Sequence, residues 1–188
     1  MISPRPHSSW LLLVGSLAGW VAAIALIVED FRLLKDPSYR PSCSINPILS
    51  CGSVMATHQA SEFGFPNPVI GVVGFSLAVT IAVLAVAGVT MPRWFWGGLW
   101  LGLVVGMGFI FWLIFQSLYR INALCPYCMV VWTFTPLMLA AVTNQLWGGA
   151  RGALGILAQW RWIVVTVYYA IVLLLVFLRF QDYWLSLV

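Results

Sequence analysis

The sequence predicts an all-α integral membrane protein with five transmembrane helices. Of its 188 residues, 62% are apolar and 7% are charged, and a soluble domain of this size could not bury so much apolar surface. The apolar residues also fall into five runs of about 20 residues, the length that a helix needs to cross the hydrocarbon core of a bilayer. We therefore expect one membrane domain over residues 1–188 and no separate soluble domain.

The five runs are separated by short segments, except for a long polar loop after the first run. The first run could be a secretory signal because Arg5 precedes it, but it is longer than a usual signal core and residues 27–30 lack a small-residue cleavage site. We therefore expect it to remain as an uncleaved span. In chain order, the expected helices cover residues 10–28, 69–89, 95–118, 129–146 and 162–178, and the long loop covers residues 29–68.

Two of the expected helices carry residues that bear on helix packing. In the third, Gly98, Gly102 and Gly106 recur every four residues, which predicts close approach of a neighbouring helix. In the fourth, Pro136 removes one backbone donor and predicts a bend. The bend either opens a pocket between helices or is a tolerated kink.

The helix count predicts which segments share a side of the membrane. The long loop 29–68 and the short segment 119–127 are separated by two crossings, so they lie on the same side. The amino terminus and the loops on its side hold four arginines and no acidic residue, whereas the other side holds five Lys or Arg together with all five carboxylates. This distribution favours a cytoplasmic amino terminus. The net charge of +4 then reflects the orientation of the chain in the membrane. The Lys and Arg residues do not form a cluster of the kind that binds nucleic acid.

Four cysteines form two pairs on the side that carries the long loop. Cys43 and Cys51 lie in the loop with seven residues between them, and Cys125 and Cys128 form a C-x-x-C motif at the mouth of the fourth helix. Pro126 suits a first helical turn, so the sulfurs lie near a helix amino terminus, where the helix dipole favours a nucleophilic thiolate. Two exchange-competent pairs on the non-cytoplasmic face, where disulfides persist, predict electron transfer between them.

Two other interpretations of the four cysteines stay open. Inert disulfides are typical of small secreted domains that have little core, which a bundle of five helices does not need. A four-thiolate zinc site, as in a non-enzymatic metal-binding membrane protein, generally uses two short-spaced pairs, and the gap between Cys43 and Cys51 fits that spacing poorly. We therefore predict no metal site.

An ordered set of motifs resembles a known family. After the loop pair comes a hydroxyl residue, Thr57, six positions beyond Cys51; then Asn67 and Gly71 at the start of the second helix; then the C-x-x-C motif that opens the fourth. Over roughly residues 10–146 this order resembles the vitamin K epoxide reductase family. The likeness is to its bacterial, DsbB-like thiol-oxidising branch without a fused thioredoxin domain.

The resemblance implies a fold and a relay. Four helices would form a core around a quinone pocket, with one peripheral helix. Cys43 would exchange with a partner thiol protein, Cys51 with Cys125, and Cys128 would face the quinone. Many bacterial relatives carry a thioredoxin-like domain after the fifth helix, so here a separate DsbA- or thioredoxin-like partner is expected, in the inner or plasma membrane setting of a disulfide-forming pathway. The electron acceptor would be menaquinone, ubiquinone or a quinone of the vitamin K type.

The resemblance also implies four quinone-binding residues. Asn67 matches the position that hydrogen-bonds a quinone carbonyl, although Asn also suits a turn or cap before a helix. Thr57 lines the pocket or caps a turn, and Met55 lies in the same segment. Trp132 stands where relatives often carry Tyr; its indole donates a hydrogen bond but accepts none, and its other interpretation is packing. The change from Tyr favours simple quinone reduction over reduction of vitamin K epoxide. A reductase that acts on vitamin K or its epoxide stays the nearest alternative function.

Overall fold

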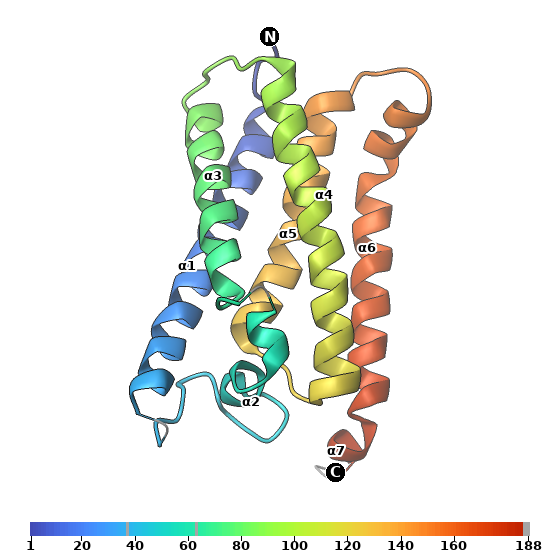
Figure 1. The fold of residues 1–188 in the computed structure, drawn as a ribbon. Coiled ribbons are helices and arrows are strands. Elements are labelled where there is room, and N and C mark those ends of the chain that lie inside the picture. The colour runs from blue at the N-terminus through green and yellow to red at the C-terminus, as the bar shows by residue number, and fades with distance from the viewer. Residues whose placement is uncertain (37, 63, 186–188) are drawn as a thin grey trace.

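The computed structural model describes residues 1–36, 38–62 and 64–185. It contains five long helices, which run side by side (Figure 1). Each is long and apolar enough to cross a membrane. The prediction of an all-α, multi-pass membrane protein with five spans is confirmed. These helices are α1 (Pro6–Lys35), α3 (Pro68–Val86), α4 (Arg93–Gln116), α5 (Pro126–Trp147) and α6 (Ala153–Arg179).

Short helices lie at the end of the bundle that carries the polar loop. The loop holds α2 (Cys51–Met55) and the 3₁₀ turn η1 (His58–Ser61). A π-helical turn, η2 (Ser117–Ile121), extends α4, and α7 (Gln181–Leu185) follows α6. The start of α1 and the short helix α7 lie at opposite ends of the bundle, as an odd number of crossings requires (Figure 1).

The helix α5 lies at the centre of the fold. It packs against α1, α4 and α6, while α3 packs against α1. One core cluster joins α1, α3, α4 and α5, and a second joins α4, α5 and α6. Only 11% of the most apolar stretch of α6 is buried, against 44% for α5, so α6 is the peripheral helix beside a four-helix core.

Three helices extend beyond the apolar runs of the sequence by three residues or more. The helix α6 begins at Ala153 rather than at residue 162, so residues 153–161, which were expected to form a loop, are helical. The helix α1 continues to Lys35, and at 30 residues its length of about 45 Å exceeds the hydrocarbon core of about 30 Å. The apolar run stops at the first charged residues, but helix formation does not, because a polar turn at the membrane surface keeps its backbone hydrogen bonds. The helix α5 begins at Pro126 and therefore includes Cys128 in its first turn.

The expected packing against the glycines of α4 is wrong within this chain. A Cβ added at Gly98, Gly102 or Gly106 would meet open space in the described part of the chain. Close approach occurs instead at α1, where a Cβ at Gly19 would collide with the ring of Phe75 on α3. Small residues permit close packing, but the sequence does not say which stripe of them faces a partner.

Candidate active site

A short parallel β-bridge holds the polar loop beside the C-x-x-C segment. The Leu124 amide donates to the Ile48 carbonyl at 2.7 Å, and the Ser50 amide donates to the Leu124 carbonyl at 2.9 Å. Cys51 follows Ser50 directly, and Cys125 follows Leu124 directly. The bridge therefore sets the two cysteines side by side, with their Sγ atoms 3.1 Å apart.

The first turn of α2 is held by serine side chains. Ser50 Oγ accepts a hydrogen bond from the Ser53 amide at 3.2 Å, and Ser44 Oγ accepts one from the Gly52 amide, also at 3.2 Å. Ser50 thus caps α2, a position at which a hydroxyl stabilises an otherwise unpaired amide. These bonds fix Cys51 as the first residue of α2.

The two cysteine pairs differ in oxidation state. Cys43 and Cys51 form a disulfide, with their Cα atoms 5.6 Å apart, whereas Cys125 and Cys128 are free thiols. Cys51 carries no proton on sulfur, so the Cys125 thiol is the only possible donor in the contact between them. The structure thus presents an oxidised loop pair against a reduced helix pair.

Three of the four cysteines are almost completely buried, and Cys128 is partly exposed. The exposed fraction is 5% for Cys43, 0% for Cys51 and 1% for Cys125. Leu26 belongs to the same buried cluster, and Val54, Met55, Tyr127 and the partly buried Cys128 pack against it. The contact between Cys51 and Cys125 is therefore buried, and Cys128 is the cysteine of the helix pair that a small soluble thiol can reach.

Cys125 precedes the first residue of α5, outside the membrane-spanning helix. A hydrogen bond from the Cys128 thiol is the largest cause that lowers its pKa, and the backbone amides of Cys128 and Tyr127 lower it further. Burial acts in the opposite direction but does not cancel these donors. The thiolate is the nucleophile in disulfide exchange, so the sulfur that touches Cys51 is the one that the site activates.

The turn that leads to Cys125 is tied to α6. Arg179 donates from Nε to the Leu118 carbonyl at 2.7 Å and from Nη2 to the side-chain oxygen of Asn122. Asn122 has a φ of 58°, in the left-handed region that Asn tolerates better than most residues. Sequence reasoning missed Arg179, and its only signal was a cation at the end of an apolar run.

Three of the predicted quinone residues lie in the polar loop or at its end. Asn67 is 8% exposed and donates from Nδ2 to the Gln59 carbonyl at 2.7 Å. It makes no capping hydrogen bond, and its buried Oδ1 has no hydrogen-bond partner among the described residues. Thr57 donates to the Val54 carbonyl at 2.7 Å and does not cap η1. Met55 packs against the cysteine cluster.

Trp132 lies in the second turn of α5. It is 4% exposed and packs in the cluster that includes Met107, Ile110 and Tyr168. Its carbonyl accepts a hydrogen bond from Tyr168 at 3.2 Å, but its buried Nε1 has no partner among the described residues. Cys128 packs against both this cluster and the cysteine cluster.

The chain matches the model of the Vitamin K epoxide reductase family over residues 10–143. It belongs to the vitamin K epoxide reductase family. The matched residues include both cysteine pairs and extend from α1 into the last turns of α5, so α6 and Arg179 lie beyond them. A search of curated proteins found no match.

Members of the vitamin K epoxide reductase family are quinone-dependent thiol-disulfide oxidoreductases, and the protein is an enzyme of this class. The prediction of redox function is confirmed at this level. Inert disulfides and a non-enzymatic metal carrier are therefore set aside as descriptions of the protein.

Four buried polar atoms have no hydrogen-bond partner among the described residues, and two of them, Asn67 Oδ1 and Trp132 Nε1, suit a quinone. A quinone carbonyl accepts hydrogen bonds, as the Nε1–H group of Trp132 could supply, and a hydroquinone hydroxyl donates them, as Oδ1 of Asn67 could receive. A buried polar atom without a partner is costly in a protein interior. Both atoms lie toward the end of the bundle that carries the polar loop.

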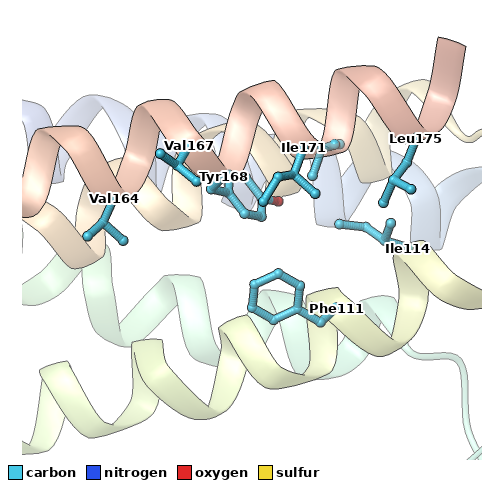
Figure 2. Close-up of a pocket in the computed structure, with 8 residues that line it drawn as sticks. Phe111, Ile114, Val164, Val167, Tyr168, Ile171 and Leu175 are labelled. Carbon is cyan, nitrogen blue, oxygen red and sulfur yellow. The ribbon is translucent and has the colours of Figure 1, made fainter.

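Two apolar cavities lie away from the cysteines. Figure 2 shows the first, of about 260 Å³, between Phe111 and Ile114 of α4 and the facing side chains of α6. The second, of about 220 Å³, lies between α4, α5 and α6 and is lined in part by Pro136. None of the cysteines or predicted quinone residues lines either cavity.

Proposed function

We propose that this protein oxidises the dithiol of a separate DsbA- or thioredoxin-like protein and passes the electron pair to a membrane quinone. The observation that carries the proposal is the 3.1 Å contact between the Sγ atoms of Cys51 and Cys125. It joins a disulfide in an aqueous loop to a dithiol at the mouth of a transmembrane helix. The net result would be disulfide formation in secreted proteins.

The relay begins at the loop disulfide. A thiolate of the reduced partner attacks Cys43 and breaks the Cys43–Cys51 bond, and the second partner thiol resolves the mixed disulfide. The partner leaves oxidised, and Cys43 and Cys51 are left as two thiols. Cys43 is 5% exposed, so the loop segment that carries it must move when a protein partner arrives.

The second exchange passes the electrons to the helix pair. The Cys51 thiolate attacks Cys125 in a Cys125–Cys128 disulfide, which forms a Cys51–Cys125 bond and releases Cys128 as a thiol. Cys43 then attacks Cys51, which reforms the loop disulfide and releases Cys125. The product has an oxidised loop pair and a reduced helix pair, and these are the states that the structure contains.

The helix pair then returns to the disulfide. A bound quinone would accept the two electrons and two protons that Cys125 and Cys128 give up. Cys128 contacts the cluster that contains Trp132, and we assign Trp132 and Asn67 to hold the ring oxygens. Met55 and Thr57 would shape the loop that covers this region.

The charge distribution supports a cytoplasmic amino terminus. Arg5 and the loops at the same end of the bundle carry no acidic residue, and the redox loop lies at the opposite end (Figure 1). The four cysteines would then face the outside of the inner or plasma membrane, where a soluble oxidoreductase and secreted substrates meet them.

Turnover of the purified protein tests the proposal. Reduced DsbA-like protein and menaquinone, ubiquinone or a vitamin K quinone are mixed with the enzyme, and quinone reduction is followed spectroscopically. Cys128→Ala and Cys43→Ala should each lose at least about 100-fold in partner-driven rate, as expected when a covalent step is removed. A small dithiol should restore turnover to Cys43→Ala alone.

The matched control is Thr166→Ala, a change on the exposed face of α6, which should keep the wild-type rate. Failure of the wild type to reduce any of the three quinones with a reduced partner would contradict the proposal. So would a Cys128→Ala variant that turns over at the wild-type rate.

A further inference from the structure

A nearly buried carboxylate lies beside the redox loop and has no part in the relay described above. Glu29, on the last turns of α1, is 6% exposed. Its Oε1 accepts a hydrogen bond from Ser42 Oγ at 2.6 Å, and its Oε2 accepts one from the Tyr39 hydroxyl at 2.9 Å. The Ser42 amide makes a longer contact with Oε2 at 3.4 Å. A buried carboxylate is tolerated only with such partners.

Arg32 completes the network from the next turn of α1. Its Nη1 donates to the Tyr39 hydroxyl at 3.2 Å, and its guanidinium lies 5.9 Å from the centroid of the Tyr39 ring. Tyr39 thus accepts from Arg32 and donates to Glu29. The two residues that donate to the carboxylate, Tyr39 and Ser42, come from one short segment of the loop, and Cys43 follows that segment directly.

The network therefore acts on the loop disulfide. Ser42 precedes Cys43 directly, so the bonds to Glu29 hold the backbone of Cys43 against α1. In this position Cys43 and Cys51 are 5% and 0% exposed, and a dithiol in solution reaches them only after residues 39–43 leave α1. The strength of the bonds to Glu29 sets how often that opening occurs.

We propose that Glu29 is a positioning residue that holds Cys43 closed against α1 and so keeps the loop disulfide seated on Cys125. The inference concerns how the loop is held, and it rests on the proposed function only in giving that disulfide a role in the relay. Hydrogen bonds to a charged group are stronger than those to a neutral one. Loss of the charge should therefore favour the open loop.

The test measures reduction of the Cys43–Cys51 bond by dithiothreitol in the purified protein without partner or quinone. Samples are quenched by alkylation, and the labelled peptides of Cys43 and Cys51 are counted by mass spectrometry. Glu29→Gln should raise the rate about tenfold, since a more open loop exposes the bond more often. Glu29→Asp keeps the charge and should give an intermediate rate.

A double-mutant cycle separates this role from a general loss of stability. Ser42→Ala, a change at an exposed residue, should also raise the rate, but it should add little once Glu29 is Gln, because the two side chains share one bond. Asp36→Asn is the matched control: Asp36 also accepts hydrogen bonds from a loop serine, Ser38, but it lies away from Cys43 in sequence and should leave the rate unchanged.

The proposal is overturned if Glu29→Gln and Ser42→Ala both leave the rate within about twofold of wild type, which is within the spread of ordinary surface substitutions. Full additivity of the two changes, or an equal effect of Asp36→Asn, overturns it as well. If Glu29→Gln fails to fold, Ser42→Ala and Tyr39→Phe decide the question. The assay needs no turnover, so a failure of the proposed relay would leave its outcome readable.

Discussion

Cys125 is the cysteine of the helix pair that contacts the loop disulfide. It contacts Cys51 at 3.1 Å, it has a 1% exposed fraction, and it precedes a helix whose first amides lower its pKa. Burial alone would keep a sulfur protonated and inert. The donors from Cys128 and from the backbone reverse that effect, so a buried cysteine gains the character of a nucleophile.

The pH dependence of Cys125 follows from these donors. Its lowered pKa means that the thiolate is already present at a pH where an ordinary thiol is protonated, and it disappears as the pH falls through the lowered value. Cys128→Ala removes the largest of the lowering causes, so the thiolate should appear only at higher pH. Ultraviolet thiolate absorbance against pH, with the loop disulfide intact, measures the shift.

The matched control for this titration is Thr133→Ala, an exposed residue of α5, which should leave the profile in place. A Cys128→Ala profile that stays in place or moves to lower pH would show that Cys128 does not stabilise the thiolate of Cys125.

At the scale of elements, close contact between α1 and α3 depends on glycine. Gly19 leaves room for the ring of Phe75, and Gly15, one turn earlier, leaves room for Met138 of α5, whose Cγ lies 2.8 Å from the place of a Cβ. In a membrane, where helix association draws on close packing, these contacts help to hold α1. The helix α1 also carries Glu29 and Leu26, so its position affects the redox loop.

A larger side chain at Gly19 should therefore weaken the fold. Gly19→Val places methyl groups where the Phe75 ring lies, and overpacking of this kind costs about 1–3 kcal/mol. Gly102→Val is the matched control, because a Cβ at Gly102 meets open space, and it should change the stability by less than about 0.5 kcal/mol. Unfolding in detergent measures both, and equal losses would contradict the assigned packing.

The two glycine patterns show where sequence reasoning reached its limit. Both Gly15 with Gly19 and Gly98 with Gly102 are spaced by four residues, and nothing local distinguishes the stripe that packs from the stripe that faces open space. The apolar runs were more informative, because bilayer thickness fixes the length of a span whatever its neighbours are. Bilayer thickness does not determine where a helix ends outside the membrane, so the extension of α1 over residues 29–35 could not be predicted in this way.

For the whole molecule, the sequence predicted that the two cysteine pairs share a side of the membrane, and the family resemblance implied that Cys51 meets Cys125. Neither indicated how these residues are held. Spacing and the parity of crossings were enough to place Cys51 and Cys125 on one side of the membrane. The supports of the site come from distant segments: the Leu124 pairing from the loop, Arg179 from α6 and Glu29 from α1. Contacts of this kind depend on tertiary structure and leave no local pattern in the chain.

The relay as a whole depends on one step, the transfer between the two pairs. The loop that holds the Cys43–Cys51 disulfide lies at the same end of the bundle as the start of α5 (Figure 1). Cys128, in the first turn of α5, packs against both the cysteine cluster and the cluster that contains Trp132. If electrons cross anywhere between the loop and the membrane, they cross from Cys51 to Cys125.

Trapping of that bond is the most direct measurement. In Cys43→Ala/Cys128→Ala only Cys51 and Cys125 remain, and mild oxidation should join them within one chain in nearly every molecule, as mass spectrometry of the linked peptides would show. The matched variant Cys51→Ala/Cys125→Ala should form far less of the Cys43–Cys128 bond. Two free sulfurs in the first variant, or equal bonding in both, would contradict a relay through Cys51 and Cys125.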